Sequence, residues 1–225
     1  MAKLLCLTAN PKPAEYSVCL TLGETFLNEY KKNNPSDTVE VVDLVTADFP
    51  DIDYTVMGAY GKLMQGVVFT DLTAEEQTAL GKRQAYIDQF LSADKVVFVT
   101  PLWEFSTPSY VKKYLDVITA NKITFKYLEN GVPVGLLFDK GIKALHIQSS
   151  GGKYTTEMVP TLNAMGGSMI LADNFGNKHL QAVLAFLGIT DYSHVYAHST
   201  NMGEELRNAS VAVATEQAIE LAKTF

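Results

Sequence analysis

Cysteine is scarce in this sequence, with 2 residues among 225. Two thiols cannot build the disulfide framework on which small secreted domains depend. The first ten residues carry one charged side chain and no long apolar stretch, so no secretory signal is expected. These features predict a reducing, cytoplasmic environment.

Long hydrophobic runs and an excess of basic charge are also missing. The uninterrupted apolar runs fall far short of the ~20 residues that span a bilayer, so we expect a soluble protein with no membrane partner. The 18 Lys and Arg residues are outnumbered by 25 Asp and Glu, giving a net charge of −7. Because binding to phosphate backbones depends on clustered cations, no nucleic-acid partner is expected.

The composition is that of a chain with a large core. Hydrophobic residues make up 47% of it, which excludes disordered and fibrous classes. A domain of this length buries roughly 70–75% of the surface of its unfolded chain. No repeat, low-complexity tract or Pro/Gly/Ser-rich linker divides the sequence, so we expect one domain over residues 1–225.

Five short apolar runs rich in β-forming residues predict strands. They cover residues 3–8, 39–43, 95–100, 143–149 and 194–198. The third run is apolar at consecutive positions, as is typical of a parallel strand covered on both faces. Cys6, His146 and His194 fall inside these runs, where a core role is expected.

Helical patterns lie between the predicted strands. Apolar residues at 18, 22, 26 and 30 form one stripe behind a possible N-cap at Ser17. Residues 73–76 have the spacing of a capping box. A third helix is predicted to begin at Pro108 with Thr107 as its cap, and two more lie between 155 and 188 and over 203–223. This alternation predicts an α/β protein with a doubly wound parallel sheet.

Two connections are longer than this alternation requires. The first, 44–72, and the second, 121–141, carry large side chains, namely Tyr54, Met57, Tyr60, Met64, Phe69, Phe125 and Tyr127. Long connections of this kind form either lids and subunit contacts or satellite cores under a loop.

Three loops follow predicted strands, at 9–17, 101–107 and 149–152. In open α/β sheets, ligands bind beyond the carboxyl ends of the strands. The first loop has no Gly-x-Gly-x-x-Gly motif, so a dinucleotide is not expected as the resident cofactor. It offers Asn10 and Ser17 beside a helix N-terminus, which favours an anion such as a terminal phosphate, unless Ser17 only caps its helix.

The other two loops favour a flat ligand. Trp103, the only tryptophan, either forms the wall of a site or fills the core. The paired glycines of residues 149–152 allow a backbone to approach a ligand closely. Together the three loops describe a slot with a phosphate end and a planar apolar end, the size of a mononucleotide flavin.

Nine segments of the sequence carry a family resemblance, namely residues 3–8 (KLLCLT), 16–17 (YS), 25–27 (TFL), 34–37 (NPSD), 91–97 (LSADKVV), 101–105 (PLWEF), 124–127 (TFKY), 143–152 (KALHIQSSGG) and 186–190 (FLGIT). In these segments the sequence resembles the FMN-dependent NADH:quinone oxidoreductases, also called azoreductases. The resemblance implies a flavodoxin-like fold, in which a doubly wound five-stranded parallel sheet forms the middle of three α/β/α layers.

By position, the resemblance implies three groups of FMN contacts. The phosphate would be held by Asn10, Ser17, Val18 and Cys19. The isoalloxazine would lie along Leu102, Trp103, Glu104 and Phe105, and its pyrimidine edge would meet Ser149, Ser150, Gly151 and Gly152. Family members commonly have Asn at position 104 and Ser at positions 10 and 19. A backbone contact at Glu104 would tolerate the change, whereas a side-chain contact would place a carboxylate near the ring and lower the flavin's potential.

The resemblance also implies the reaction. One FMN per subunit would take a hydride from NADH or NADPH and then reduce a quinone, azo or nitroaromatic compound in a ping-pong cycle. Members of this family are homodimers with flavin sites at the subunit boundary, where Phe125, Tyr127 and residues 44–72 are expected. Tyr154 is a candidate proton donor to the acceptor, and no catalytic residue is assigned beyond these two tyrosines.

The sequence also bears on other classes of protein. No Gly-x-Ser-x-Gly, Cys-x-x-Cys or paired histidines occur at ligand spacing, so no metal site is predicted. A phosphate-switch receiver would need acidic residues where Ala9, Asn10 and Pro101 stand. A flavodoxin-type FMN electron carrier, and a non-enzymatic redox sensor that binds flavin or nucleotide, remain open.

Overall fold

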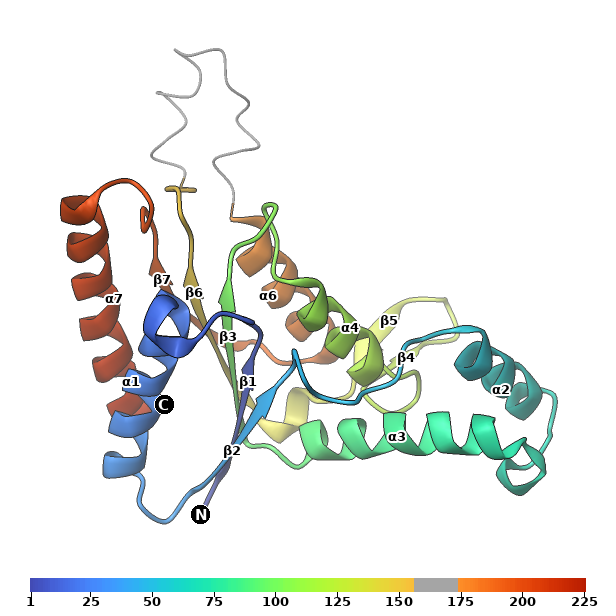
Figure 1. Cartoon of the computed structure of the whole chain (residues 1–225). Coiled ribbons are helices and arrows are strands. Elements are labelled where there is room, and N and C mark those ends of the chain that lie inside the picture. The colour runs from blue at the N-terminus through green and yellow to red at the C-terminus, as the bar shows by residue number, and fades with distance from the viewer. Residues whose placement is uncertain (156–173) are drawn as a thin grey trace.

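The computed structural model describes residues 1–155 and 174–225. Within them, five parallel strands form one sheet in the order β2-β1-β3-β6-β7 (Figure 1). The strands are β1 (Lys3–Thr8), β2 (Thr38–Asp43), β3 (Lys95–Pro101), β6 (Lys143–Ser149) and β7 (Asp191–Ala197). The chain adds β2 on one side of β1 and β3 on the other, so the topological switch point lies between the carboxyl ends of β1 and β3.

Four of the five predicted strands agree with the structure to within one residue at each end. The fifth prediction, 194–198, was displaced, because β7 begins at Asp191 and ends at Ala197. Asp191 pairs with Lys143 and Ala144 pairs with Tyr192, so the polar start of β7 is fixed by its neighbour β6. Register with a partner strand is tertiary information that a local apolar pattern does not contain.

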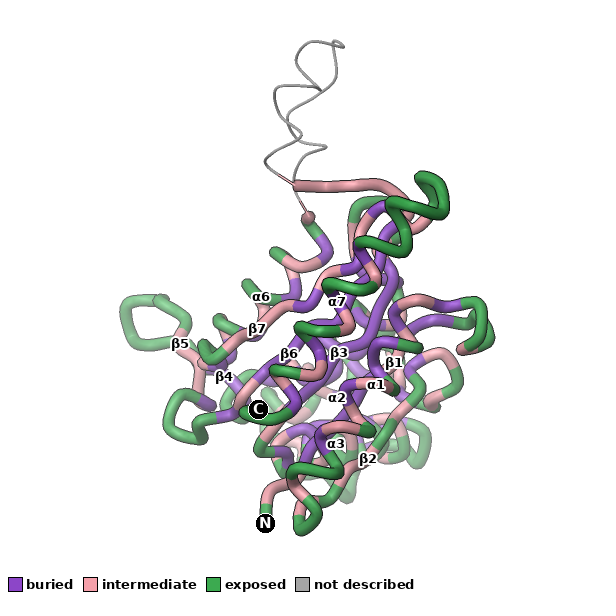
Figure 2. Tube along the Cα trace, turned by 90° about the vertical axis from the view of Figure 1, so that its left-hand side faces the viewer, coloured by how far each residue is buried: buried purple, intermediate pink, exposed green. Residues whose placement is uncertain are grey.

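Helices cover both faces of the sheet, which confirms the predicted α/β sandwich. On one face lie α1 (Val18–Asn33) and α7 (Glu204–Thr224), and on the other lie α3 (Ala74–Leu91), α4 (Ser109–Ile118) and α6 (Phe175–Leu187) (Figure 1). Each face has its own apolar cluster, so the central strands are buried from both sides (Figure 2). Cys6 lies in one of these clusters, and burial raises the pKa of its thiol to about 12.

The predicted helix starts depend on local capping. The Ser17 side chain accepts a hydrogen bond from the Leu20 N–H, and Thr73 and Glu76 form both bonds of a capping box. The last helix follows Gly203, as predicted, and ends at Thr224. The helix predicted between 155 and 188 includes α6, but positions 156–173 lie outside the described residues.

The start of α4 corrects the sequence prediction. Pro108 has φ −53° and ψ 150°, so it is the extended residue before the helix rather than its first helical residue. Thr107 therefore stands one position too early to cap, and its hydroxyl has no hydrogen-bond partner among the described residues.

The two long connections contain structure that the sequence analysis did not assign. The first holds α2 (Tyr54–Met64) and a short 3₁₀ turn, Phe69–Asp71. Asp53 caps α2 by accepting a hydrogen bond from the Val56 N–H, and α2 packs on α3 around Val56 and Leu80, as a satellite core.

The second long connection holds a hairpin of β4 (Phe125–Tyr127) and β5 (Pro133–Gly135), whose exposed loop is green in Figure 2. Two more 3₁₀ turns are Ala14–Tyr16 and Phe138–Lys140.

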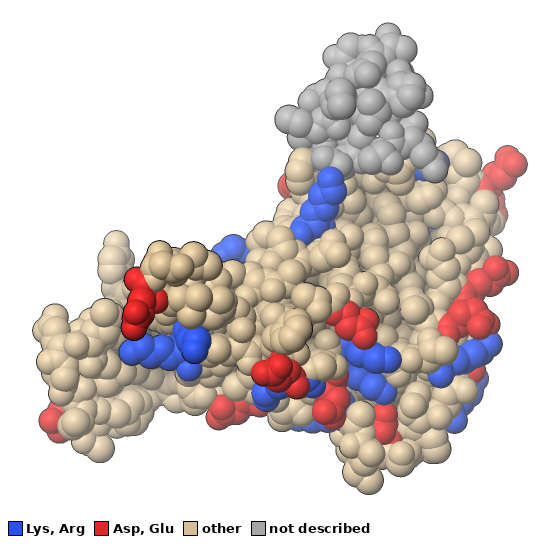
Figure 3. All heavy atoms as spheres, turned by 180° about the vertical axis from the view of Figure 1, so that it is seen from behind, with Lys and Arg blue, Asp and Glu red and all other residues tan. Residues whose placement is uncertain are grey.

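The surface carries charges of both signs. On the face shown in Figure 3, Lys and Arg lie next to Asp and Glu instead of forming a continuous basic area. Among the described helices, none is both long and apolar enough to cross a membrane.

Candidate functional site

A cavity of about 460 Å³ lies at the carboxyl ends of β1, β3 and β6, beside the topological switch point. The three loops singled out in the sequence all contribute to it. Its lining residues are Asn10, Lys12, Glu15, Tyr16, Ser17, Val18, Pro101, Leu102, Trp103, Ser149, Ser150, Gly151, Thr200, Asn201 and Arg207. The volume falls in the range of small-molecule and cofactor sites.

One end of the cavity is built to attract an anion. The Asn10 side-chain amide donates a 2.7 Å hydrogen bond to the Ser17 hydroxyl, which ties the loop after β1 to the N-terminus of α1. The first N–H groups of a helix have no intrahelical partner, and Ser17 takes only that of Leu20. The remaining amides of the first turn, with the helix dipole, favour a phosphate-like group.

Cys19 lies behind this end of the cavity rather than on its wall. Its side chain is fully buried, with Sγ 3.4 Å from Ser17 Oγ and 3.5 Å from Asn10 Nδ2. Among the residues predicted to hold phosphate, Asn10, Ser17 and Val18 line the cavity, and Cys19 supports two of them.

The loop after β3 is a tight turn around Trp103. Trp103 and Ser106 exchange two backbone hydrogen bonds of 2.8 Å each, so Glu104 and Phe105 occupy the two central positions with φ of 46° and 62°. The Leu102 N–H donates to the Ser149 carbonyl at 2.7 Å, which links the turn to the end of β6. Trp103 is 39% exposed, so it walls the cavity instead of filling the core.

Glu104 and Phe105 are at the tip of this turn and do not line the cavity of a single chain. The Phe105 ring meets the Tyr154 ring edge-on, with 5.7 Å between centroids. Tyr154 also closes over Gly152, where a Cβ atom would lie 3.1 Å from the tyrosine oxygen. Phe105 and Tyr154 are therefore in contact next to the Trp103 turn, but neither is among the residues that line the cavity.

The loop after β6 is fastened to the segment after β7. The Thr200 N–H donates to the Ser150 carbonyl at 3.0 Å, and the Asn201 N–H donates to the Gly151 carbonyl at 3.1 Å. A Cβ atom on Gly151 would lie 2.8 Å from Asn201 Nδ2, so a larger residue here must displace the Asn201 side chain. Of the four residues predicted to meet the flavin's pyrimidine edge, Ser149, Ser150 and Gly151 line the cavity and Gly152 does not.

A fourth loop, which was not predicted from the sequence, also contributes to the cavity. Thr200, Asn201 and Arg207 line the cavity from the segment after β7 and from the first turns of α7. A signal for this loop was present in the sequence, since residues 199–203 follow the fifth predicted strand and ligands bind beyond the carboxyl ends of such strands.

Tyr127 lies elsewhere in the chain. It is on β4 of the hairpin, 59% exposed, and packs only on Phe125 among the aromatic pairs of the described residues. In a single chain it does not line the cavity, so any role at the site requires a second subunit.

A buried polar layer supports the loops from below. The two ring nitrogens of His146 lie 2.9 Å from Thr100 Oγ1 and 3.1 Å from Asn177 Oδ1, which joins the end of β3 to α6. The Tyr192 hydroxyl donates to the same Asn177 oxygen. Since that oxygen can only accept, the neutral His146 ring donates from Nδ1 and accepts the threonine proton at Nε2.

The rings of His146 and His194 are stacked, 5.3 Å apart, and Tyr196 continues the row. Burial, together with the neighbouring His194, lowers the pKa of His146 to about 3, and burial lowers the pKa of His194 to about 4. Both rings are therefore neutral at pH 7. His146 is buried in the core, whereas His194 is half-buried and lines a pocket, as a near-core residue. Within residues 1–155 and 174–225, no group of His, Cys, Asp and Glu side chains is arranged to hold a metal ion.

Comparison with known proteins places this architecture in a family. The model of the flavodoxin-like fold matches residues 2–222. The FMN-dependent NADH:quinone oxidoreductase 3 of a Bacillus cereus strain is 40% identical over 225 residues, the full length of both chains. The chain belongs to the family of FMN-dependent NADH:quinone oxidoreductases. An enzyme of the same family name from Staphylococcus haemolyticus is 39% identical, again over both full lengths.

Solved structures of this family agree with the fold. An azoreductase from Bacillus anthracis str. Sterne superposes with a TM-score of 0.84 at 32% identity and full coverage of both chains. An FMN-dependent NADH-azoreductase from Bacillus anthracis str. Ames Ancestor, solved in complex with FMN, gives a TM-score of 0.83 at 36% identity, covering 99% of this chain and 100% of that one. The flavodoxin-like fold and the family resemblance inferred from the sequence are confirmed.

Proposed function

We propose that this protein is an FMN-dependent NAD(P)H oxidoreductase that reduces quinones and azo compounds. The observation that carries the proposal is the cavity at the switch point, where an anion-attracting helix start and a half-exposed tryptophan line the same space. Full-length relatives with this activity in their names, and a related azoreductase crystallised with FMN, support it.

The residues present fit FMN. Asn10, Ser17 and the first amides of α1 suit a singly attached phosphate, and Leu102 and Trp103 offer an apolar wall to a flat ring. Gly151 and Asn201 both line the cavity, and the missing side chain of Gly151 leaves the room that Asn201 occupies beside it. When bound, FMN supplies the hydride-transfer chemistry that no protein side chain provides.

The chain's own residues would orient the bound FMN and enclose it. We infer that Asn10 and residues 17–19 hold the phosphate, Leu102 to Phe105 lie along the isoalloxazine, and Ser149 to Gly152 meet its pyrimidine edge. His146 and its partners keep the ends of β3 and β6 in register beneath these loops. The role of such groups is to position the cofactor and exclude competing reactions, which requires no dedicated acid or base.

We propose that donor and acceptor use one binding place, the open side of the cavity, which we place beside the paired rings of Phe105 and Tyr154. NADH or NADPH would occupy it first, give up a hydride and leave. A quinone, azo or nitroaromatic compound would then stack in the same place and receive two electrons, which makes the cycle ping-pong. Tyr154 is the side chain that would supply a proton to the reduced acceptor.

We further propose a cytoplasmic homodimer, with one FMN per subunit. Large apolar side chains are exposed on α2, among them Tyr54, Met57 and Met64, and on the hairpin that carries Tyr127. Exposed apolar surface of this extent favours a subunit contact. In this proposed dimer we place Tyr127 at the cavity of the neighbouring subunit.

Absorbance and turnover test the proposal in two steps. The purified protein, or the protein after addition of FMN, is expected to show bound flavin absorbance, and NADH oxidation is expected to start when menadione or an azo dye is added. A protein that takes up no FMN would overturn the proposal. A protein that binds FMN but does not accept electrons from NADH or NADPH would instead be an electron carrier or a sensor.

A further inference from the structure

The chain's two arginines have opposite environments. Arg83, on α3, is buried, and its guanidinium donates to the Tyr60 hydroxyl and to the carbonyls of Asp116 and Thr119. Arg207, on α7, is exposed, and its guanidinium forms no hydrogen bond or ion pair with any residue that the structure describes. Arg83 therefore has a structural role, whereas the Arg207 guanidinium makes no contact of this kind with the described residues that would explain its position.

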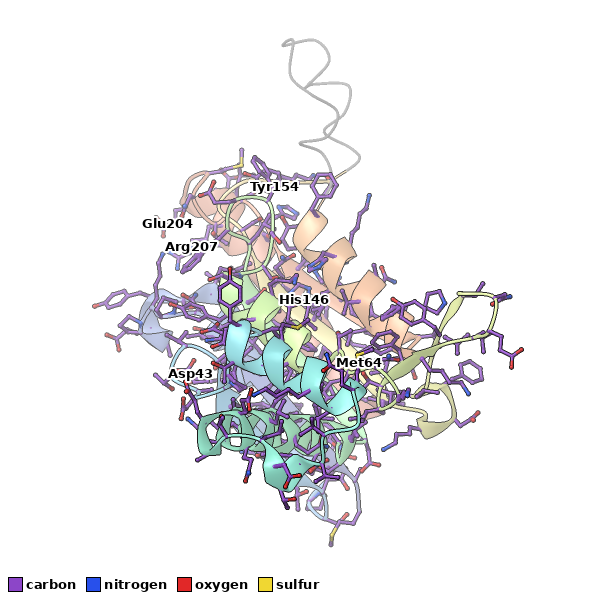
Figure 4. The ribbon with its side chains drawn as sticks, turned by 90° about the vertical axis from the view of Figure 1, so that its right-hand side faces the viewer. Asp43, Met64, His146, Tyr154, Glu204 and Arg207 are labelled. Atoms are coloured by element: carbon purple, nitrogen blue, oxygen red, sulfur yellow. The ribbon has the colours of Figure 1, made fainter. Side chains whose placement is uncertain are left out.

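Arg207 lies beside the anion-attracting end of the cavity. Helices α1 and α7 run side by side on one face of the sheet, and both begin at its carboxyl end (Figure 1). Arg207 lines the 460 Å³ cavity and also an adjoining pocket of about 280 Å³, and it shares both pockets with Ser17 and Val18. Figure 4 shows Arg207 at the same end of the molecule as Tyr154, beyond His146.

The charged residues near Arg207 do not neutralise its guanidinium. Glu15 lines both pockets, yet no ion pair joins it to Arg207, and Glu204 on the preceding turn forms none with the guanidinium either. Lys12 is the other cation in the large cavity, but it does not line the adjoining pocket between α1 and α7. Arg207 is therefore the cation that shares both pockets with the first turn of α1.

We propose that Arg207 contacts the 5′-phosphate of FMN and makes the site discriminate FMN from riboflavin. This inference rests on the proposed function, since it assumes that the cavity binds flavin. Asn10, Ser17 and the amides of α1 are neutral donors, so on their own they leave the phosphate charge without a cationic partner. A guanidinium supplies that partner and donates in a planar fork that matches phosphate oxygens.

Flavin titrations of the full-length protein, freed of flavin, test the proposal. The affinities for FMN and for riboflavin are measured by fluorescence quenching for the wild type, Arg207→Gln, Arg207→Lys and Lys31→Gln. Lys31 is an exposed cation near the far end of α1, so its replacement removes the same charge away from the cavity.

Arg207→Gln is expected to weaken FMN binding about tenfold and to leave riboflavin binding unchanged, because a charge-assisted hydrogen bond contributes on this scale. Arg207→Lys should recover part of the loss, Lys31→Gln should change neither affinity, and the difference between wild type and Arg207→Gln should shrink in high salt. Circular dichroism confirms that each variant is folded.

Three results would overturn the inference. Unchanged FMN affinity in Arg207→Gln would show that the guanidinium does not reach the phosphate. Equal losses for FMN and riboflavin would show a packing role instead of a charge contact. Equal affinities of the wild type for riboflavin and FMN would support the flavin site but exclude the phosphate contact. A wild type that binds neither flavin would overturn the proposed function itself.

Discussion

Trp103 and Ser106 are joined by two backbone hydrogen bonds, which close a two-residue turn at the carboxyl end of β3. The positive φ angles of Glu104 and Phe105 make this a turn in which Asn, Asp and Gly are favoured. The sequence has none of these at the two positions, so the turn is strained at the place where the isoalloxazine is proposed to lie. Asn, the residue that the family resemblance leads us to expect at position 104, would adopt this conformation at lower cost than Glu.

Replacing Glu104 with Asn is therefore expected to stabilise the protein by about 1 kcal/mol, because the strain of a left-handed residue is relieved. For a chain of this size the melting temperature should rise by about 2–4 °C. Glu104→Ala is the matched control, since it removes the carboxylate without the conformational preference of Asn. Equal gains in both variants would assign the effect to charge rather than to backbone strain.

The same pair of variants tests where the Glu104 carboxylate lies relative to the flavin. If it lies near the ring, both Glu104→Asn and Glu104→Ala should raise the midpoint potential of the bound flavin, since a nearby negative charge disfavours the reduced anion. Potentiometric titration measures the shift. A potential that stays at the wild-type value in both variants would mean that the contact at 104 is made by backbone.

Gly151→Val is expected to lower FMN affinity by about tenfold or more, as a β-branched side chain blocks close backbone approach. A Cβ atom at Gly151 would lie 2.8 Å from Asn201 Nδ2, so the Asn201 side chain, which lines the cavity, must also move. Gly81→Ala, in the middle of α3 with nothing within 4 Å of the new Cβ, is the matched control and should gain about 0.5–1 kcal/mol of stability. Retention of wild-type FMN affinity by Gly151→Val would place the flavin elsewhere.

The histidine pair gives stability a specific dependence on pH. The pKa values of His146 and His194 in the folded protein, about 3 and about 4, lie below the ordinary value of about 6.5. Between about pH 6.5 and pH 4.5 the two histidines become protonated in the unfolded chain but stay neutral in the folded protein. The free energy of unfolding therefore falls as pH falls, by up to about 1.4 kcal/mol per pH unit for each histidine.

Urea unfolding at about pH 7, 6 and 5 measures this slope, and His194→Phe should reduce it because one of the two titrating rings is lost. The carboxylate of Asp37 does not interfere, since hydrogen bonds from the Ala2 N–H and the Tyr30 hydroxyl hold its pKa at about 2. Its stabilisation is lost only at lower pH, below about 4. A slope in His194→Phe as steep as in the wild type would contradict the assignment.

Tyr127→Ala tests the proposed homodimer and its shared site. If a partner's hairpin covers the open side of the cavity, the variant should raise the KM for quinone or azo acceptors several-fold while the affinity for FMN stays within about twofold. Tyr16→Ala offers a comparison with another exposed tyrosine, one that lines the cavity of its own chain. Unchanged acceptor kinetics in Tyr127→Ala would remove this residue from the site.

Much of the fold was determined by local sequence. Consecutive apolar residues specified the buried strands, Ser17 and the Thr73 to Glu76 capping box specified two helix starts, and the order of strands and helices specified a doubly wound sheet. These signals are readable because burial on both faces and capping act on residues that are neighbours in the chain. The loops at the carboxyl ends of β1, β3 and β6 followed from the same pattern.

Tertiary structure decided the rest. The start of β7 was fixed by pairing with β6, the folding of residues 54–64 into α2 by packing on α3, and the recruitment of Thr200, Asn201 and Arg207 by the approach of the loop after β7 to Gly151. The unusual backbone of Glu104 depended on a turn closed by Trp103 and Ser106. Each of these contacts joins a segment to another whose position only the folded chain establishes, so no local pattern of apolar or capping residues specifies them.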